Sequence, residues 1–300
     1  MLSLILLSSV FLAFYDICKK ASVKDNAVLP VLLCSTLAGF LAFTAVAVLC
    51  GRAVSPLTAG GDGVAALPWT LMGLCFVKAA IVASSWVFTF MGLRTLPITI
   101  ATPIRASAPA AVFVASFFLY GEVPTFVQFV GVIAVLAGYW TFSWAGKAEG
   151  IDFFHNRAVW CAIAGACLSA VSSLWDKYLF QVRALPVVPA QFYFQLFLVV
   201  IYGVLLISHV EVERWRKSVG VKFTWRWSIP CVGILLAAAD YFYFLGIQPE
   251  GTPISVCSLL RRFSVVLTFI LGAKFFHEQN LVRKGLALSA ILIGCVLLCL

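Results

Sequence analysis

The sequence predicts an all-α membrane protein: ten transmembrane helices arranged as two inverted five-helix repeats. Three observations predict this fold. The 300 residues are 63% hydrophobic and only 11% charged, their apolar runs are long and continuous, and charged residues recur in the same order in both halves. Soluble domains are about one quarter charged, which excludes a soluble fold. A transmembrane barrel fits poorly, because its strands alternate apolar and polar residues.

Each expected helix is an apolar run bounded by charges, glycine or proline, and about 20 such residues span a bilayer. The first run has neither a basic leader nor a cleavage site, so we expect it to remain as the first span. The ten expected spans are 2–18, 28–50, 68–93, 97–119, 124–144, 157–180, 187–208, 226–248, 252–275 and 280–299.

An internal repeat is visible when residues 90–138 are laid on 244–294. Charged residues that coincide inside apolar runs carry more weight than matching Leu and Val. Five helices per repeat is an odd number, so the second repeat enters the membrane from the opposite side, as in many secondary transporters. We therefore expect repeats at 1–146 and 147–300 within one membrane domain. The coincident pairs are Asp16 with Asp176, Pro97 with Pro253, Arg105 with Arg261, and Glu122 with Glu278.

Cysteine, histidine and charge patterns argue against several other functions. The ten cysteines lie mostly in apolar runs and form no CxxC pair, so we expect neither a metal site nor a cofactor. The sequence has no HExxH, GxSxG or glycine-rich phosphate loop, so we expect no enzyme. The net charge of +9 lies mostly in short loops, where it sets membrane orientation rather than binding nucleic acid.

Short motifs at corresponding places in the two halves resemble those of the drug/metabolite transporter superfamily, and specifically of its ten-helix EamA-type members. The resemblance covers nearly the whole chain and implies two five-helix repeats that form a transporter. It also implies cytoplasmic termini, whereas the excess of Lys and Arg in alternate loops places both termini outside. The motifs are Tyr15-Asp16 with Lys19, Trp175-Asp176 with Lys177, Gly121-Glu122 and His277-Glu278.

Charged residues in mid-span are the main candidates for a substrate site, because each costs about 2.5–3.5 kcal/mol to insert. Helical spacing adds polar neighbours to them, such as Thr102 on the face of Arg105 and Ser85 two turns from Lys78. The candidate substrate-binding residues are Lys78, Arg105, Arg261, Arg262, Asp240, Tyr241, Tyr243, Ser85, Thr102 and Ser258.

The charge balance of these candidates predicts an anionic substrate. Four cations would face one central anion, Asp240, and guanidinium groups suit phosphate and carboxylate. Arg261-Arg262 also resembles the basic pair of the phosphate-translocator branch. The alternatives are a generic amino-acid or metabolite exporter, a lipid flippase that recognises a phosphate headgroup, and a Lys78–Asp240 pair that serves packing alone.

A second set of charges lies at helix ends and supplies candidates for gating or proton coupling: Asp16, Lys19, Asp176, Lys177, Glu122 and Glu278. The competing interpretation is that these residues form interfacial ion pairs, which add little to stability, or helix caps. We expect a multi-pass protein of a bacterial cytoplasmic membrane, monomeric or homodimeric, whose partners are a small-molecule substrate and the lipid bilayer.

Overall fold

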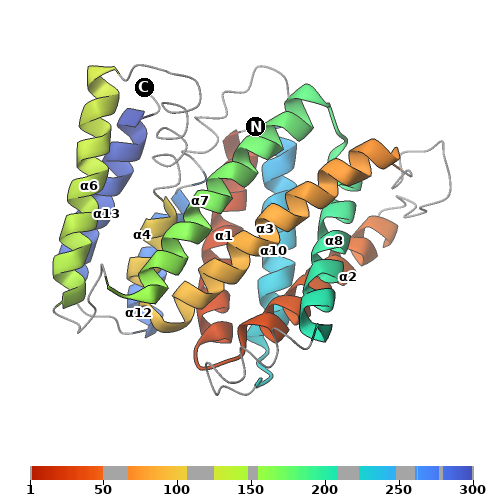
Figure 1. Ribbon diagram of the computed structural model, residues 1–300, viewed down its shortest axis with the longest axis horizontal. Coiled ribbons are helices and arrows are strands. Elements are labelled where there is room, and N and C mark those ends of the chain that lie inside the picture. The colour runs from red at the N-terminus through yellow and green to blue at the C-terminus, as the bar shows by residue number, and fades with distance from the viewer. Residues whose placement is uncertain are drawn as a thin grey trace.

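The computed structural model describes residues 2–49, 67–106, 125–147, 155–208, 223–247, 261, 263–276 and 280–298. Within these ranges the chain forms ten α-helices and one short π-helical segment, and no strand (Figure 1). Five of the helices are long and apolar enough to cross a membrane. The predicted fold class, an all-α membrane protein, is confirmed.

The helices follow the predicted spans closely. They are α1 (Leu2–Val23), α2 (Val28–Leu49), α3 (Trp69–Thr95), α4 (Ile98–Ala106), α6 (Phe126–Lys147), α7 (Arg157–Lys177), α8 (Val187–Ile207), α10 (Ser228–Ile247), α12 (Phe263–Phe276) and α13 (Leu281–Leu298), with a π-helical segment η1 (Tyr178–Val182) after α7. The predicted spans 97–119 and 252–275 extend beyond the described residues.

The first helix is longer than expected. The prediction stopped it at residue 18, before Lys19 and Lys20, but α1 continues to Val23. Both lysines are buried, and the Lys20 ammonium donates to the carbonyls of Leu93 and Leu96 at the end of α3. Because the protein itself accommodates the two charges, they do not mark the end of the span.

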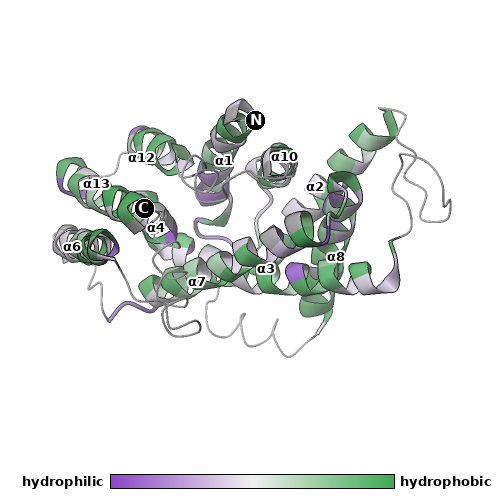
Figure 2. Cartoon of the chain, turned by 90° about the horizontal axis from the view of Figure 1, so that it is seen from above, coloured by the Kyte–Doolittle hydropathy of each residue, from purple (hydrophilic) through white to green (hydrophobic). Residues whose placement is uncertain are grey.

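Two rows of helices face each other across the molecule. One row contains α1, packed against α10 and α12, and the other contains α7, packed against α3 and α4. Helices α2 and α8 contact each other at one end of the rows, and α6 and α13 form a pair at the other end (Figure 2).

Glycines allow the closest helix contacts. A Cβ added to Gly39 of α2 would lie 2.7 Å from the Gly233 carbonyl oxygen of α10. On the α6–α13 pair, a Cβ on Gly294 would lie 2.7 Å from the Gly131 carbonyl oxygen. Small residues at such contacts are typical of membrane helices, where packing rather than hydrophobicity drives association.

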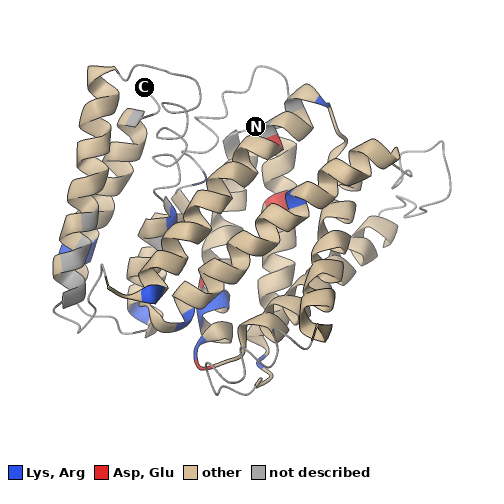
Figure 3. Ribbon diagram, viewed as in Figure 1, with Lys and Arg blue, Asp and Glu red and all other residues tan. Residues whose placement is uncertain are grey.

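The outer faces are apolar, as a lipid environment requires. Phe126, Trp140, Leu136 and Val282 are more than half exposed on α6 and α13. Charged positions are few along the helices, and several lie in their interior turns rather than at their ends (Figure 3). These interior charges define the site.

Candidate functional site

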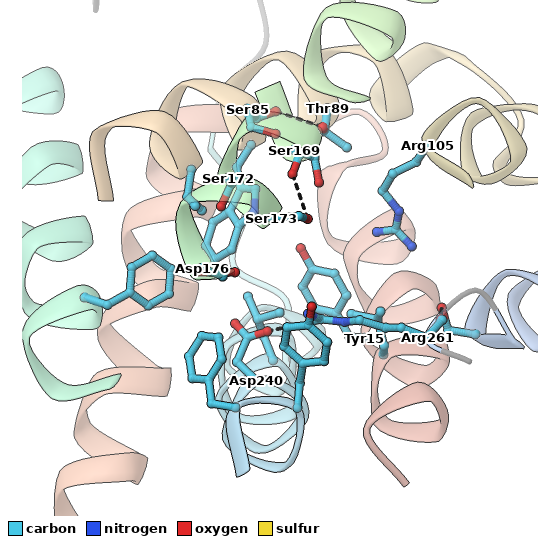
Figure 4. A pocket seen from close by; sticks show the side chains of 18 of the residues that line it. Tyr15, Ser85, Thr89, Arg105, Ser169, Ser172, Ser173, Asp176, Asp240 and Arg261 are labelled. Carbon is cyan, nitrogen blue, oxygen red and sulfur yellow. Dashed lines mark hydrogen bonds and ion pairs between the residues drawn. The ribbon is translucent and has the colours of Figure 1, made fainter. Parts of the chain in front are cut away.

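A cavity of about 140 Å³ lies between the two rows. Its lining comes from α1, α3, α4, α7, α8, α10 and α12 and includes the residue Arg261 just before α12 (Figure 4). The titratable groups that line it are Tyr15, Lys19, Lys78, Arg105, Asp176, Asp240, Tyr243 and Arg261.

Arg105 of α4 forms a two-pronged ion pair with Asp16 of α1. Its Nη1 donates to Asp16 Oδ1 at 2.8 Å, and its Nη2 donates to Oδ2. Thr268 of α12 donates a longer hydrogen bond of 3.3 Å to Oδ2. The Asp16 carboxylate is almost fully buried, so its charge is compensated by groups from two other helices.

Lys78 of α3 pairs with Asp176 of α7. Its ammonium also lies over three aromatic rings, whose centroids are 4.0 Å (Phe244), 4.7 Å (Phe194) and 5.5 Å (Phe180) from Nζ. Ring faces attract cations more strongly where water is excluded. This lysine is therefore held by one carboxylate and an aromatic cage.

Arg261 pairs with Asp240 of α10, with 2.6 Å between Nη2 and Oδ1. The guanidinium lies 4.0 Å from the centroid of the Tyr243 ring. Ser264 donates to the Arg261 carbonyl at 2.8 Å, one turn further along. The pair ties the start of α12 to the middle of α10.

Lys19 of α1 is the fourth cation of the cavity and is only 2% exposed. Its Nζ lies 5.1 Å from the Tyr15 ring centroid and 4.6 Å from that of Phe90. In the part of the chain that the structure describes, no carboxylate comes within ion-pair distance of it. Lys19 thus differs from Lys78, Arg105 and Arg261.

Hydroxyl groups line one side of the cavity. Ser85 of α3 donates to the Gly165 carbonyl at 2.7 Å, and Thr89 donates to the Ser85 carbonyl at 2.8 Å. Three serines of α7 (Ser169, Ser172 and Ser173) join them. Figure 4 shows these five hydroxyl-bearing side chains on the side of the cavity opposite Tyr15, Asp240 and Arg261.

Most of the described candidates from the sequence meet at this cavity. The lining includes Lys78, Ser85, Arg105, Asp240, Tyr243 and Arg261 from the substrate-binding set, and Lys19 and Asp176 from the gating set. Asp16 joins them through Arg105. Tyr241 instead lines an apolar outer pocket and packs against the Phe43 ring at 6.1 Å.

Other candidates lie outside what the structure describes. Helices α4 and α7 contain Thr102 and Lys177, but their side chains are not among the described ones. Arg262, Ser258, Glu122 and Glu278 fall outside the described residues altogether.

The structure corrects the predicted charge balance. Four cations were expected to face Asp240 alone, with Lys78 as its alternative partner. Instead, Lys78 pairs with Asp176, and Asp240 pairs with Arg261. The central site therefore contains more negative charge than predicted, because Asp16 and Asp176 reach it from helix positions interpreted as interfacial.

The sequence analysis missed the serines of α7 and the ring of Tyr15 as parts of the lining. Serine is common in membrane helices, and its hydroxyl commonly bonds its own helix, as Ser173 does to the Ser169 carbonyl at 3.1 Å. Only the i, i+3, i+4 spacing of Ser169, Ser172 and Ser173 indicated a shared face.

Together, the apolar spans and the central charged cavity define an integral, multi-pass membrane protein. Residues 1–144 match the model of the EamA-like transporter family. The resemblance to the EamA-type members of the drug/metabolite transporter superfamily is thereby confirmed over that segment, and the protein is a membrane transporter of small solutes.

Two further comparisons concern the whole chain. A solved crystal structure covers 99% of the chain, with 95% of its own length covered, at 17% sequence identity and a TM-score of 0.65. At that identity the likeness supports the fold alone. No curated protein matches the chain.

Proposed function

We propose that this protein is a secondary transporter that moves a small anionic metabolite by alternating access through the central cavity, in a bacterial cytoplasmic membrane, without catalysing a reaction. The observation that carries the proposal is the cluster of four cations and three carboxylates that the described residues place around one cavity, with Lys19 and Lys78 buried and Arg105 and Arg261 partly buried. Charges in mid-membrane are costly and are typical of transport pathways. Among the described residues this cluster has one cation more than it has carboxylates, which favours an anionic solute.

The three ion pairs described above can exchange an internal partner for a solute. Each connects two different helices: α1 with α4, α3 with α7, and α10 with the start of α12. A buried pair offers both a cation and an anion that a solute can engage in place of the internal partner. Rearrangement of such pairs couples solute binding to movement of the helices that carry them.

The helix packing supports the inverted repeat and therefore alternating access. Helix α1 packs on α10 and α12, and α7 packs in the same way on α3 and α4; α2 packs on α10, and α8 on α3. The pairs α2–α8 and α6–α13 complete the pattern. Exchanging the first five helices for the second five leaves these named contacts unchanged, as a pseudo-two-fold axis requires.

Different contacts join the two rows at the two ends of the cavity. Near the end of α1, Lys20 binds the carbonyls that end α3. Towards the other end, the ring of Phe180 of η1 packs at a tilt against that of Phe244 of α10, with centroids 4.7 Å apart. In the proposed cycle, one end opens by losing the lysine contact and the other by separating the two rings.

The test is solute uptake into liposomes that contain the purified protein, with small carboxylates and phosphate esters as solutes. A transporter should show faster uptake when the same solute is preloaded inside, because exchange avoids the return of the empty carrier. The variant Asp240→Asn with Arg261→Gln removes one ion pair without leaving an unpaired charge. Uptake should then fall by about tenfold or more, which corresponds to the free energy of one charge-assisted hydrogen bond to the solute.

Arg183→Gln is the matched control, because Arg183 is exposed after η1. It should leave uptake unchanged. Unaltered uptake by the Asp240/Arg261 variant would contradict a substrate site in this cavity. Translocation of fluorescent phospholipids in place of solutes would favour the flippase alternative.

A further inference from the structure

We propose that Lys19 is the anion-binding residue of the cavity and that the solute carries a single carboxylate as its only charged group, together with uncharged hydrogen-bond donors, as a small hydroxy acid does. This inference rests on the proposed transport function and narrows its substrate class. It is carried by the partners of the four cations and by the hydroxyl side of the cavity.

The first step is the contrast between Lys19 and the other cations. Lys78, Arg105 and Arg261 each contact a carboxylate. Lys19 has the two ring contacts, with Tyr15 and Phe90, and no such carboxylate among the described residues. An ammonium removed from water costs several kcal/mol unless an anion compensates it. A ring face offsets only part of that cost, so this lysine is the one prepared for an external anion.

The second step is the charge count. Within the described residues, the cavity cluster contains four cations (Lys19, Lys78, Arg105 and Arg261) and three carboxylates (Asp16, Asp176 and Asp240). One carboxylate on the solute makes the cluster neutral. A phosphate monoester carries about −1.5 to −2 charges at neutral pH, which leaves a buried negative excess. The count therefore favours a carboxylate over a phosphate.

The third step concerns the rest of the solute. The hydroxyl protons of Ser85, Thr89 and Ser173 are already donated to backbone carbonyls. Their oxygens keep free lone pairs and can only accept. At these three positions a solute must therefore supply the hydrogen-bond donor, and a hydroxyl group does so without altering the charge count.

Four three-carbon probes separate the possibilities: glycerate, glycerol 3-phosphate, glycerol and serine. We expect the purified protein to be stabilised against heat by glycerate and to take it up into liposomes. Lys19→Met keeps a side chain of similar length but removes the charge. It should weaken glycerate binding by about tenfold or more, which corresponds to the free energy of one charge-assisted hydrogen bond. Lys19→Arg should retain part of the binding. Lys24→Met, which removes an exposed lysine of the loop after α1, should have no effect.

The results distinguish this inference from the proposed function. If glycerol 3-phosphate, glycerol or serine is preferred, or if folded Lys19→Met binds glycerate normally, the inference is wrong while transport stands. If none of the four is bound or taken up by the intact protein, the inference also fails. The proposed transport function is then tested separately, by uptake of the other small carboxylates and phosphate esters and by the variant Asp240→Asn with Arg261→Gln. Thermal unfolding of each variant without ligand shows whether it is folded.

Discussion

Arg105 and Asp16 show how a single buried residue depends on its partner. Asp16 is 1% exposed, and its carboxylate accepts two hydrogen bonds from the guanidinium. Arg105→Met should destabilise the protein by about 3–5 kcal/mol, because it leaves a buried charge without its main partner. The midpoint of thermal unfolding in detergent measures this effect.

The double variant Asp16→Asn with Arg105→Gln is the matching comparison. It removes both charges and keeps polar groups that can bond each other, so it should be more stable than Arg105→Met alone. Equal instability of the two variants would mean that the charges are not coupled, and that Arg105 acts through packing or other contacts.

At this scale the sequence identified Lys78, Arg105 and Arg261 as residues within the spans, but it interpreted Asp16 and Asp176 as interfacial and did not predict which residues pair. Lys78, Arg105 and Arg261 were recognised because their positions within apolar runs fix their depth. Pairing depends on which helices are neighbours. That α3 lies against α7, and so brings Lys78 to Asp176, cannot be inferred from spacing along one chain.

Among the elements, the α2–α10 contact depends on glycine. A Cβ at Gly233 would overlap the Ser35 carbonyl oxygen of α2, and backbone atoms cannot move aside easily. Gly233→Ala should therefore separate the two helices and lower the yield of folded protein, as measured by size-exclusion chromatography and thermal unfolding.

Gly203 of α8 provides the control, since nothing lies within 4 Å of a Cβ built there. Alanine is favoured over glycine inside a helix by about 0.5–1 kcal/mol, so Gly203→Ala should be neutral or slightly stabilising. If both substitutions behave alike, helix propensity rather than close packing determines the outcome at Gly233.

Helix positions were predicted well because apolar runs of fixed length are the dominant signal in a membrane chain. The end of α1 was missed for a physical reason. A lysine normally ends a span, but Lys20 is buried against the end of α3 and the helix continues to Val23. Only the tertiary partner reveals that the charge is satisfied.

Across the whole molecule, two kinds of polar contact hold the end of the cavity near the C-terminus of α1. Lys20 connects the two rows, from α1 to α3. Asn26 connects parts of one row: its side chain donates to the Thr224 carbonyl at 2.8 Å and accepts from the Thr224 amide at 2.9 Å, just before α10. Only the first contact lies across the proposed opening.

Lys20→Met should therefore shift the protein towards a state that is open at this end. Loss of charge-assisted hydrogen bonds, each worth about 1.5–3 kcal/mol, changes a two-state population by about tenfold or more. The measurement is the rate at which a polar thiol reagent modifies a cysteine placed at Ser172, a residue of the cavity lining, in a chain without its native cysteines. The rate should rise in Lys20→Met.

Asn26→Ala separates opening from general loosening. It removes contacts within one row, so it should lower the unfolding temperature but leave the rate of modification at position 172 near that of the parent. If both variants increased the rate of modification at position 172 equally, access to the cavity would depend on overall stability rather than on the Lys20 contact. A Lys20→Met protein with unchanged access would exclude this lysine from closing the cavity, because a contact that closes an end must expose the cavity when it is lost.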